Sequence, residues 1–318
     1  MSTRTAYSRA LDLTNGVVEM SHGGGGRAMA QLIDQLFADA FANDILAQGN
    51  DQAAFNLPKG RVVMSTDSFV ISPLFFPGGN IGNLAVHGTV NDVALSGGTP
   101  LYLTAGFILE EGYPLKDLKT IVDSMAEAAR EAGVLIVTGD TKVVERGHGD
   151  GVYINTTGIG VVDEAINISG NRAQAGDKIL INGFVGDHGV AIMSLREGLG
   201  FESTIQSDCA SLNGLITDMV AAVPDIHVMR DPTRGGLAAT LNELAHQSGV
   251  GMVLNEDNIP IRDEVRGACE ILGLDPLYVA NEGKLLAICS AEDADKLLAA
   301  MRAHPLGEQS AIIGEVIE

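Results

Sequence analysis

Hydrophobic positions along the first half of the chain repeat at two periods, which predict an order of helices and strands. Apolar residues recur every three or four positions over 29–41, directly after four glycines, and this period predicts an amphipathic helix. Runs rich in Val, Ile and Thr predict strands at 61–70, 101–109, 134–143 and 152–162. Helical patterns are found between these strands at 81–96 and 115–132. The first half therefore mixes the two kinds of element.

A polar segment, DEAINISGNRAQAGD, follows at 163–177, and we place a domain boundary there. It gives an N-terminal domain over 1–163, with a loose leader before the glycines, and a C-terminal domain over 164–318. In the second domain we predict strands at 178–186, 251–257, 284–290 and 310–318. We predict helices near 188–198, 207–222, 233–247, 261–272 and 291–303. Each half mixes strands and helices, so the fold class is α/β or α+β.

The charge of the chain excludes some classes of ligand. It has 41 acidic and 20 basic residues, a formal net charge of −21. This charge would repel a phosphate backbone, so we expect no nucleic-acid partner. A small anion such as a nucleotide would need a bridging cation, and carboxylates would hold a divalent metal for that purpose.

Cysteine usage and apolar runs indicate the compartment. The cysteines, Cys209, Cys269 and Cys289, form no C-x-x-C pair, which suits a reducing compartment better than a disulfide framework. The first twenty residues have no continuous apolar stretch, and no apolar run approaches the roughly 20 residues needed to cross a bilayer. We therefore expect a cytoplasmic protein with no signal peptide and no membrane partner.

The glycine run HGGGG at 22–26 has two interpretations. It matches neither the Walker A loop nor a G-x-G-x-x-G turn after a strand. Glycine backbone N–H groups at a helix N-terminus can still bind phosphate. From the residues alone, phosphate contact and a plain flexible hinge are equally supported.

Four aspartates lie where we predict element boundaries. Asp67 and Asp140 come at predicted strand ends, Asp92 lies in VNDVALSGG, and Asp231 precedes a glycine pair and a helix. Such positions gather ligand-binding side chains in α/β proteins, and carboxylate oxygens suit Mg²⁺ bound to nucleotide phosphates. For any single aspartate a turn or helix-cap role is the better interpretation. Four of them in an acidic chain favour the metal interpretation.

Lys142 and Glu282 are candidate proton carriers. Lys142 follows Asp140 by two residues, so the two side chains should point to one side of a strand. A lysine beside phosphates could bind them, or act as a base if desolvated. Glu282 precedes a buried-looking strand. For both, a surface ion pair is the ordinary alternative.

Seven motifs in one order resemble the HypE family of hydrogenase maturation factors. They are HGGGG (22–26), STDSFVISPLFFPGGNIGNLAVHGTVNDVALSGGTP (65–100), GFILEEG (106–112), VTGDTKVV (137–144), GDHG (186–189), RDPTRGG (230–236) and ANEGKL (280–285). This family belongs to the superfamily of aminoimidazole ribonucleotide (AIR) synthetase and selenophosphate synthetase. The resemblance implies an α+β fold of two AIR synthetase-type domains. It also implies a homodimer whose N-terminal domains pair into a barrel-like sheet with ATP sites nearby.

The resemblance also implies an activity. Members of the family use ATP and Mg²⁺ to dehydrate a thiocarbamate on their own C-terminal cysteine, loaded by the carbamoyltransferase HypF, to a thiocyanate. The cyanide then passes to iron on the HypC–HypD complex, as a ligand for a [NiFe]-hydrogenase. Asp67, Asp92 and Asp140 resemble the metal–phosphate carboxylates, and Lys142 and Glu282 the groups that handle the amide protons. The nucleotide contacts implied by the family motifs are His22, Gly23, Gly24, Gly25, Gly26, Asn91, Asp92, Thr141 and Asp231.

One departure from the family leaves two rival interpretations. The family ends in a tail closing with Pro-Arg-Ile-Cys, whereas this sequence ends at Glu318. Cys289 lies in an apolar run and is expected to be an inert core residue. A tail-less ATP-binding scaffold of the maturation complex, or another ATP-dependent enzyme of the superfamily, are therefore the alternatives to a self-carbamoylated dehydratase.

Overall fold

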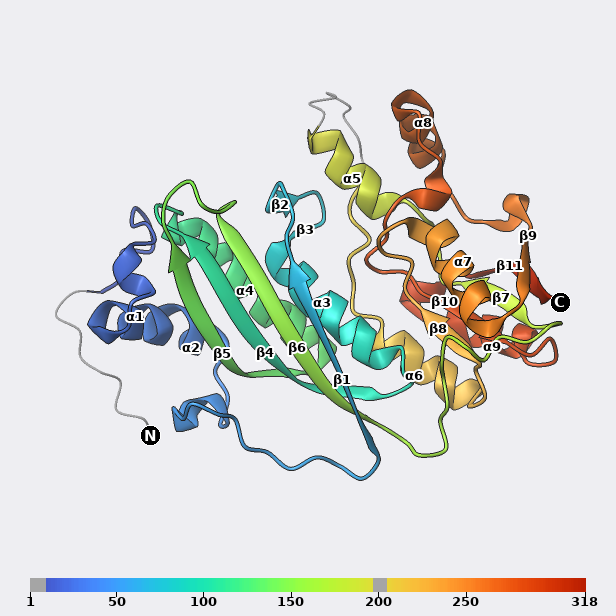
Figure 1. Cartoon of the computed structure of the whole chain (residues 1–318), viewed down its shortest axis with the longest axis horizontal. Helices are drawn as coiled ribbons and strands as arrows, with labels where there is room; N and C mark the ends of the chain where they lie inside the picture. The colour runs from blue at the N-terminus through green and yellow to red at the C-terminus, as the bar shows by residue number, and fades with distance from the viewer. Residues whose placement is uncertain (1–9, 197–204) are drawn as a thin grey trace.

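The computed structural model describes residues 10–196 and 205–318, which fold into two units lying side by side (Figure 1). Residues 1–9 of the predicted leader and 197–198 of a predicted helix lie outside the described residues. The fold is α+β, as predicted. Within the described ranges, none of the helices is long and apolar enough to span a bilayer.

The N-terminal unit is a four-stranded sheet covered by helices on one face (Figure 1). Its strands, in sheet order, are β1 (Arg61–Phe69), β6 (Val152–Val162), β4 (Thr99–Glu110) and β5 (Leu135–Val144). The parallel pair β4 and β5 is joined by α4 (Leu115–Ala132), and the other pairs are antiparallel. Helices α3 (Ile81–Ala94) and α4 pack against each other and against the sheet.

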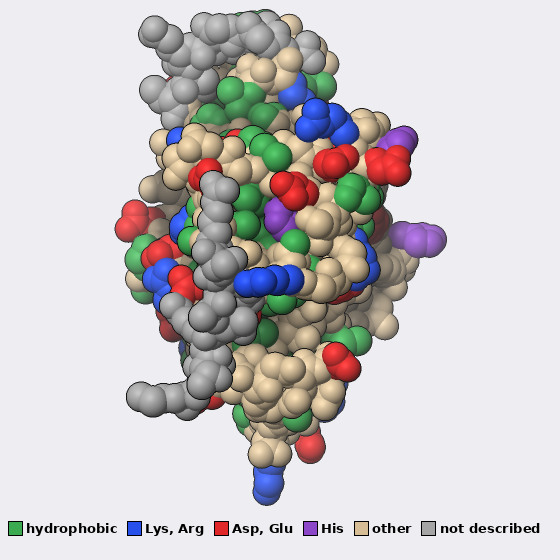
Figure 2. Space-filling view, turned by 90° about the vertical axis from the view of Figure 1, so that its left-hand side faces the viewer, with side chains coloured by type: hydrophobic (Ala, Val, Ile, Leu, Met, Phe, Trp, Pro, Cys, Tyr) green, Lys and Arg blue, Asp and Glu red, His purple; other side chains and the backbone are tan. Residues whose placement is uncertain are grey.

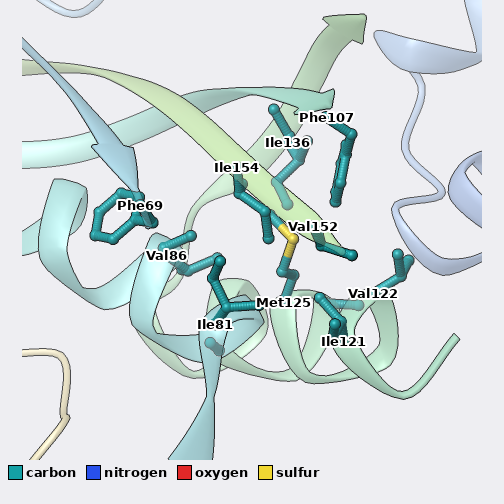
Figure 3. Close-up of a cluster of buried hydrophobic side chains, with 14 of the residues drawn as sticks. Phe69, Ile81, Val86, Phe107, Ile121, Val122, Met125, Ile136, Val152 and Ile154 are labelled. Carbon is teal, nitrogen blue, oxygen red and sulfur yellow. The ribbon is translucent and has the colours of Figure 1, made fainter. Parts of the chain in front are cut away.

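A continuous apolar core fills the space between this sheet and its helices (Figure 3). Ile154 of β6 and Ile136 of β5 point from the sheet toward Met125 and Ile121 of α4. Strand alternation places every second side chain on this buried face. The residues between them lie on the opposite face, where Val62, Met64 and Ile108 are exposed.

The predicted helix at 29–41 is built from three short helical segments. A 3-10 turn, Met20–His22, precedes the glycines, and α1 (Gly26–Leu32), a π-helical turn (Ile33–Phe37) and α2 (Ala38–Ala40) follow. On the surface that the N-terminal helices and β5 help to form, acidic, basic and apolar side chains are interspersed (Figure 2).

The C-terminal unit is a five-stranded antiparallel sheet with helices on both faces. Its strands, in sheet order, are β8 (Val228–Arg230), β10 (Leu286–Cys289), β7 (Lys178–Ile181), β11 (Ala311–Ile317) and β9 (Gly251–Leu254). Its helices are α5 (Asp187–Arg196), α6 (Asn213–Ala222), α7 (Gly236–Ser248), α8 (Asp263–Leu272) and α9 (Ala294–Ala303). Leu180 packs in the core with α6 and α9, whereas its neighbours Ile179 and Ile181 pack in the core with α7. The central strands are therefore buried on both faces, which explains why they are short continuous apolar runs.

Several sequence expectations need correction. The described part of the predicted leader is not loose, because Val18 is buried and its N–H donates to the Tyr113 carbonyl at 2.8 Å. The strand expected over 178–186 ends at Ile181. The helix expected from 207 begins at Asn213, because residues 205–212 form neither helix nor strand and run along the N-terminal unit. Strand β8 was not predicted, and neither was the short β2–β3 pair (Phe75–Phe76 and Gly79–Asn80). The boundary between 163 and 164 stays a prediction.

Candidate active site

A pocket of about 900 Å³ lies between the two units. The N-terminal unit lines it with Asp67 of β1 and Asp92 of α3, and the C-terminal unit with Asp231 and Glu282. The structure thus brings together four of the predicted site residues, two from each half of the chain. They come from positions as far apart as 67 and 282.

The local structure explains the direction of each N-terminal carboxylate. Asp67 does not end its strand: it pairs with Thr156 inside the β1–β6 ladder, on the face that packs against the helices. Asp92 lies within α3, not at a boundary, and accepts a hydrogen bond from the hydroxyl of Ser65 at 2.8 Å. The expectation that all four aspartates lie at element boundaries holds for Asp231, which directly follows β8.

Burial and mutual repulsion raise the pKa values of three of these acids. Burial, with a smaller contribution from Asp67, raises the pKa of Asp92 against the opposing bond from Ser65. Burial, followed by the charge of Asp92, raises the pKa of Asp231 to about 6. Burial, followed by the carboxylates of Asp208 and Asp231, raises the pKa of Glu282 well above its ordinary value. A pocket with this charge distribution favours a cation.

Arginine side chains reach the same pocket from the C-terminal unit. Arg234 Nη2 lies 4.0 Å from Asp67 Oδ1 and is otherwise exposed, so it can reorient toward a bound anion. Arg230 also lines the pocket and pairs with Glu243 at 3.0 Å. Neither residue was singled out in the sequence, although Arg230 and Arg234 both lie in RDPTRGG.

The pocket suits a magnesium ion that shares its ligands with a nucleotide. Among the described residues, no group of three or more His, Cys, Asp or Glu side chains is placed to hold a metal by itself. Mg²⁺, however, commonly takes one or two carboxylates and completes its shell with phosphate oxygens and water. Asp67, Asp92 and Asp231 offer carboxylates of this kind. The raised pKa values of Asp92 and Asp231 include a repulsion that a cation would relieve.

Asp140 and Lys142 form a separate group on β5. Lys142 Nζ lies 2.5 Å from Asp140 Oδ2, and both side chains are exposed. The prediction that they point to one side of the strand is confirmed. Neither residue lines the pocket between the units.

Strand register explains why Asp140 does not join Asp67. Asp140, Gly106, Asn155 and Ser68 form one row across the four strands. Asp67 lies in the neighbouring row, so alternation directs its side chain to the opposite face of the sheet. Three strand spacings, about 14 Å in total, separate β5 from β1. Within one chain, the predicted site of Asp67, Asp92 and Asp140 around one metal ion is therefore not assembled.

The glycine run lies against β5, beside this second group. A Cβ on Gly23 would come 2.6 Å from the backbone nitrogen of Val143. Gly25 and Gly26 have φ values of +80° and +79°, the left-handed region that favours glycine. His22 is buried, and its Nδ1 accepts a hydrogen bond from the Glu19 N–H at 3.0 Å. Burial lowers the pKa of His22, so its ring is mainly neutral near pH 7.

A smaller pocket of about 130 Å³ connects the glycine-run helix with β5. Ile33, Phe37 and Phe107 give it apolar walls, and Asp140 and Thr141 lie at one side. Thr141 is the predicted nucleotide contact that reaches this space.

Asn91 lies behind the main pocket and does not line it. Its amide nitrogen donates to the carbonyls of Ala210 at 3.0 Å and Glu282 at 3.3 Å. Its amide oxygen accepts from Leu212 N–H at 2.7 Å. Both amide hydrogens have partners, so the structure favours a positioning role over the predicted nucleotide contact.

Comparison with known proteins identifies relatives of the whole chain. Residues 49–162 match the N-terminal domain, and residues 174–318 the C-terminal domain, of AIR synthase related proteins. Carbamoyl dehydratase HypE of Azotobacter vinelandii is 68% identical over 307 residues, which are 96% of this chain and 90% of that protein.

Solved structures agree with this assignment. A hydrogenase maturation protein HypE in complex with ATP has a TM-score of 0.92 and 54% identity, over 94% of this chain and 89% of that chain. A HypE–HypF complex contains a chain with a TM-score of 0.79 and 52% identity, over 90% of this chain and 92% of that chain.

Proposed function

Because the chain belongs to the HypE family of AIR synthase related proteins, we propose that it is an ATP-dependent carbamoyl dehydratase of hydrogenase maturation. The observation that carries the proposal is the pocket that joins Asp67 and Asp92 with Asp231 and Glu282. It combines carboxylates suited to a metal-bound phosphate with a partly buried carboxyl group, Glu282, suited to proton transfer. Both are required for dehydration of an amide.

The proposed substrate is a thiocarbamate, R–S–C(=O)–NH₂, on a C-terminal cysteine. The amide oxygen attacks the γ-phosphorus of ATP and ADP leaves. The oxygen is then part of a phosphate ester, which is a far better leaving group than the original amide oxygen. Loss of both N–H protons and cleavage of the C–O bond give the thiocyanate R–S–C≡N and phosphate, so the carbamoyl group loses the elements of one water. The cyanide group then serves a [NiFe]-hydrogenase.

Glu282 is the proposed acceptor of an amide proton. A carboxylate whose pKa is raised is a stronger base, and general bases act best when their pKa is near the working pH. Cations in the pocket, including Arg234 and the metal, would keep Glu282 ionised before it takes the proton. Lys142 is the second candidate for handling the amide protons.

Asp67, Asp92 and Asp231 are the proposed carboxylates on the metal–phosphate side. Mg²⁺ held there would neutralise charge that develops on the transferring phosphoryl group. Arg234 is placed to bind phosphate oxygens from the opposite wall. On the β5 side, the glycine run is the proposed loop over the nucleotide. The buried His22 directly precedes this loop and anchors its first end.

The proposal includes a homodimer formed by the N-terminal units. The uncovered face of their sheet exposes Val62 and Met64 near one end and Ile108 near the other, and apolar side chains gathered on an exposed face can mark an interaction site. Within the described residues, no strand pairs with the outer edges of β1 and β5. Closing two such sheets into a barrel would bring the β1 edge of one chain near the partner's β5 edge. Asp140 and Lys142 would then lie beside the β1 edge of the neighbouring chain, where they are proposed to act on the nucleotide and substrate and not to join Asp67 around one metal ion.

The proposed partners follow the same family assignment. The solved HypE–HypF complex supports HypF as the enzyme that loads the carbamoyl group. The HypC–HypD complex is the proposed acceptor of cyanide. The cytoplasmic location stays a prediction.

A peptide assay would test the proposed function. A synthetic peptide that ends in S-carbamoyl cysteine is incubated with the protein, Mg²⁺ and ATP, and its mass is followed together with ADP. We expect the peptide to lose the mass of one water in step with ADP formation. Glu282→Gln should still bind ATP but should lose peptide dehydration by about 100-fold or more. ATP turnover without any change in peptide mass would contradict the proposal and favour a different superfamily activity.

A further inference from the structure

The main chain of Glu282 is held on both sides by side chains that do not line the pocket. Its N–H donates to Asp208 Oδ1 at 3.1 Å. Its carbonyl accepts from Asn91 Nδ2 at 3.3 Å. Asp208 lies in the irregular segment 205–212, and Asn91 lies in α3 of the N-terminal unit. Three separate parts of the chain therefore meet at the backbone of one residue, on the two peptide groups that flank the Glu282 Cα.

The residue after Glu282 allows this close approach. A Cβ on Gly283 would come 1.8 Å from the carbonyl oxygen of Asp208, far inside contact distance. Gly283 is therefore needed so that the two segments can lie against each other. Its own carbonyl accepts from Asn182 Nδ2 at 3.2 Å. The backbone of the ANEG motif is thus fixed at successive residues.

An ion pair fixes Asp208 in turn. Its Oδ2 lies 3.2 Å from Lys284 Nζ, and the side chains are 3% and 13% exposed. Lys284 follows Glu282 by two residues, so the pair closes a short loop around the glutamate. Moving the Asp208 carboxylate away would leave the nearly buried Lys284 charge uncompensated, which is strongly unfavourable, so the pair restrains the carboxylate.

Asn91 connects this arrangement to the metal side of the pocket. Its amide also bonds Ala210 and Leu212, so it fixes the segment that carries Asp208. The next residue in α3, Asp92, lines the pocket. One rigid helix therefore carries both a pocket carboxylate and the contact that holds Glu282.

From this arrangement we propose that Asp208 and Asn91 are positioning residues for Glu282. Through the two peptide groups that flank the Glu282 Cα they fix the distance between the proton acceptor and the phosphate-binding carboxylates. The inference rests on the proposed function, since it assigns Glu282 the role of the base. A base displaced by about 1 Å typically costs about 100-fold in rate, so the clamp is expected to act on kcat.

Paired variants in one background test the inference. Removing Asp208 alone would leave Lys284 unpaired, so both proteins carry Lys284→Met. Asp208→Asn keeps an oxygen that can accept from the Glu282 N–H, whereas Asp208→Ala does not. Steady-state kcat and KM for ATP and for the S-carbamoyl peptide are compared. The matched control is Asp177→Ala, a buried carboxylate that accepts from Gln174 N–H at 2.9 Å and does not line the pocket.

We expect Asp208→Asn/Lys284→Met to keep most of the kcat of Lys284→Met. Asp208→Ala/Lys284→Met should lose about 100-fold in kcat, with little change in KM for ATP. Asp177→Ala should lower the melting temperature and leave kcat unchanged. Asn91→Leu, which keeps the side-chain volume and removes the bond to Glu282, should act like Asp208→Ala. If the Asp208→Ala protein does not fold, the kcat of Asn91→Leu tests the inference instead.

Two results separate failure of the inference from failure of the proposed function. Equal kcat values for the Asn and Ala variants at 208, or for Asn91→Leu and the wild type, would overturn the inference alone. Full activity in Glu282→Gln would overturn the role of Glu282 itself, whatever the Asp208 variants do.

Discussion

At the residue scale, the pocket is a place where function opposes stability. Asp92, Asp231 and Glu282 lie near one another, and burial together with neighbouring carboxylates raises the pKa of each. Binding sites often bring like charges together at a cost in stability, and a bound ligand cation removes that cost. The free protein should therefore become more stable when one of these charges is removed.

Asp231→Asn is expected to stabilise the free protein in a pH-dependent way. The pKa of Asp231 is raised to about 6 in the folded protein, so the folded state holds the proton more tightly than the unfolded state. The cost of ionising it is absent below about pH 4 and is fully present above about pH 6. The variant should gain up to about 3 kcal/mol in free energy of unfolding at pH 8, and progressively less as the pH falls through 6.

Urea unfolding at pH 8, 6 and 5 measures this gain. Asp225→Asn, which removes an exposed carboxylate, is the control and should show no comparable gain. In the presence of Mg²⁺ and ATP the wild type should have the higher free energy of unfolding, because Asp231→Asn loses a proposed metal–phosphate contact. An equal gain at pH 5 and pH 8 would contradict the electrostatic explanation.

Sequence reasoning found the titratable residues of the pocket but not the residues that hold them. Asp67, Asp92, Asp231 and Glu282 were identified from motifs and charge, and they converge. Asp208 and Lys284 act through contacts between segments about 75 residues apart, which no local pattern encodes. For Asp140 and Lys142 the periodicity predicted their shared direction. It could not show that they lie on the opposite face of the sheet from Asp67.

At the element scale, the glycines of the HGGGG run are not equivalent. Gly23 is in contact with β5, where a methyl group would meet the backbone of Val143 at 2.6 Å. Gly24 has open space, because a methyl group there would lie 3.8 Å from its nearest neighbour, the carbonyl oxygen of Met20. The first glycine therefore anchors the loop to the strand that carries Asp140 and Lys142, and the later ones give it freedom.

Gly23→Ala and Gly24→Ala should differ for this reason. Gly23→Ala must displace the loop from β5, and such overpacking typically costs about 1–3 kcal/mol. Gly24→Ala should change the free energy of unfolding by less than about 0.5 kcal/mol. Chemical unfolding and ATP titration of both variants measure the difference. Similar ATP affinities in the two proteins would argue against a nucleotide-side role for the anchored loop.

Helices and strands with a strong hydrophobic periodicity were predicted well, and segments whose structure depends on tertiary contacts were not. Helix α4 was predicted over 115–132 and extends over Leu115–Ala132. Its apolar stripe, Pro114 just before it and Gly133 just after it all indicate the same two ends. Residues 207–212 have a helical pattern but form no helix, because Leu212 and Ala210 bond to Asn91 of the other unit. Strand β8 has three residues, which is too short for a period to be recognised.

At the scale of the whole molecule, the sheet of the N-terminal unit is incomplete. One face exposes apolar side chains, and in the part of the chain that the structure describes both edges lack a pairing strand. The predicted site is incomplete in the same way, since Asp140 and Lys142 lie apart from the pocket. A homodimer would resolve both features together.

Met64→Glu is expected to convert the proposed dimer to a monomer. Met64 is 69% exposed in the single chain, and a symmetric interface would bring two new charges into one apolar contact. Sedimentation velocity measures the change in mass. Ile271→Glu on α8, at a residue that is 65% exposed, is the control and should leave the dimer intact. A Met64→Glu protein that remains dimeric would show that the dimer uses another surface.

Complementation between two inactive chains tests whether one site draws on both. Lys142→Ala and Glu282→Gln chains are mixed under conditions that allow subunits to exchange. If Lys142 serves the neighbouring chain, each mixed dimer contains one intact site, and random exchange restores about a quarter of wild-type activity. If both residues act within one chain, the mixture stays as inactive as its parents.

The place of the last strand in its sheet sets an order of events during synthesis. Strand β11 lies between β7 and β9, so the C-terminal sheet cannot close until residues 311–317 have emerged. The N-terminal sheet has all its strands once Val162 is made. Domains of nascent chains generally fold as units, N-terminal first. Two growing chains could thus pair through their N-terminal units before either has a catalytic pocket, and assembly would precede the ability to consume ATP.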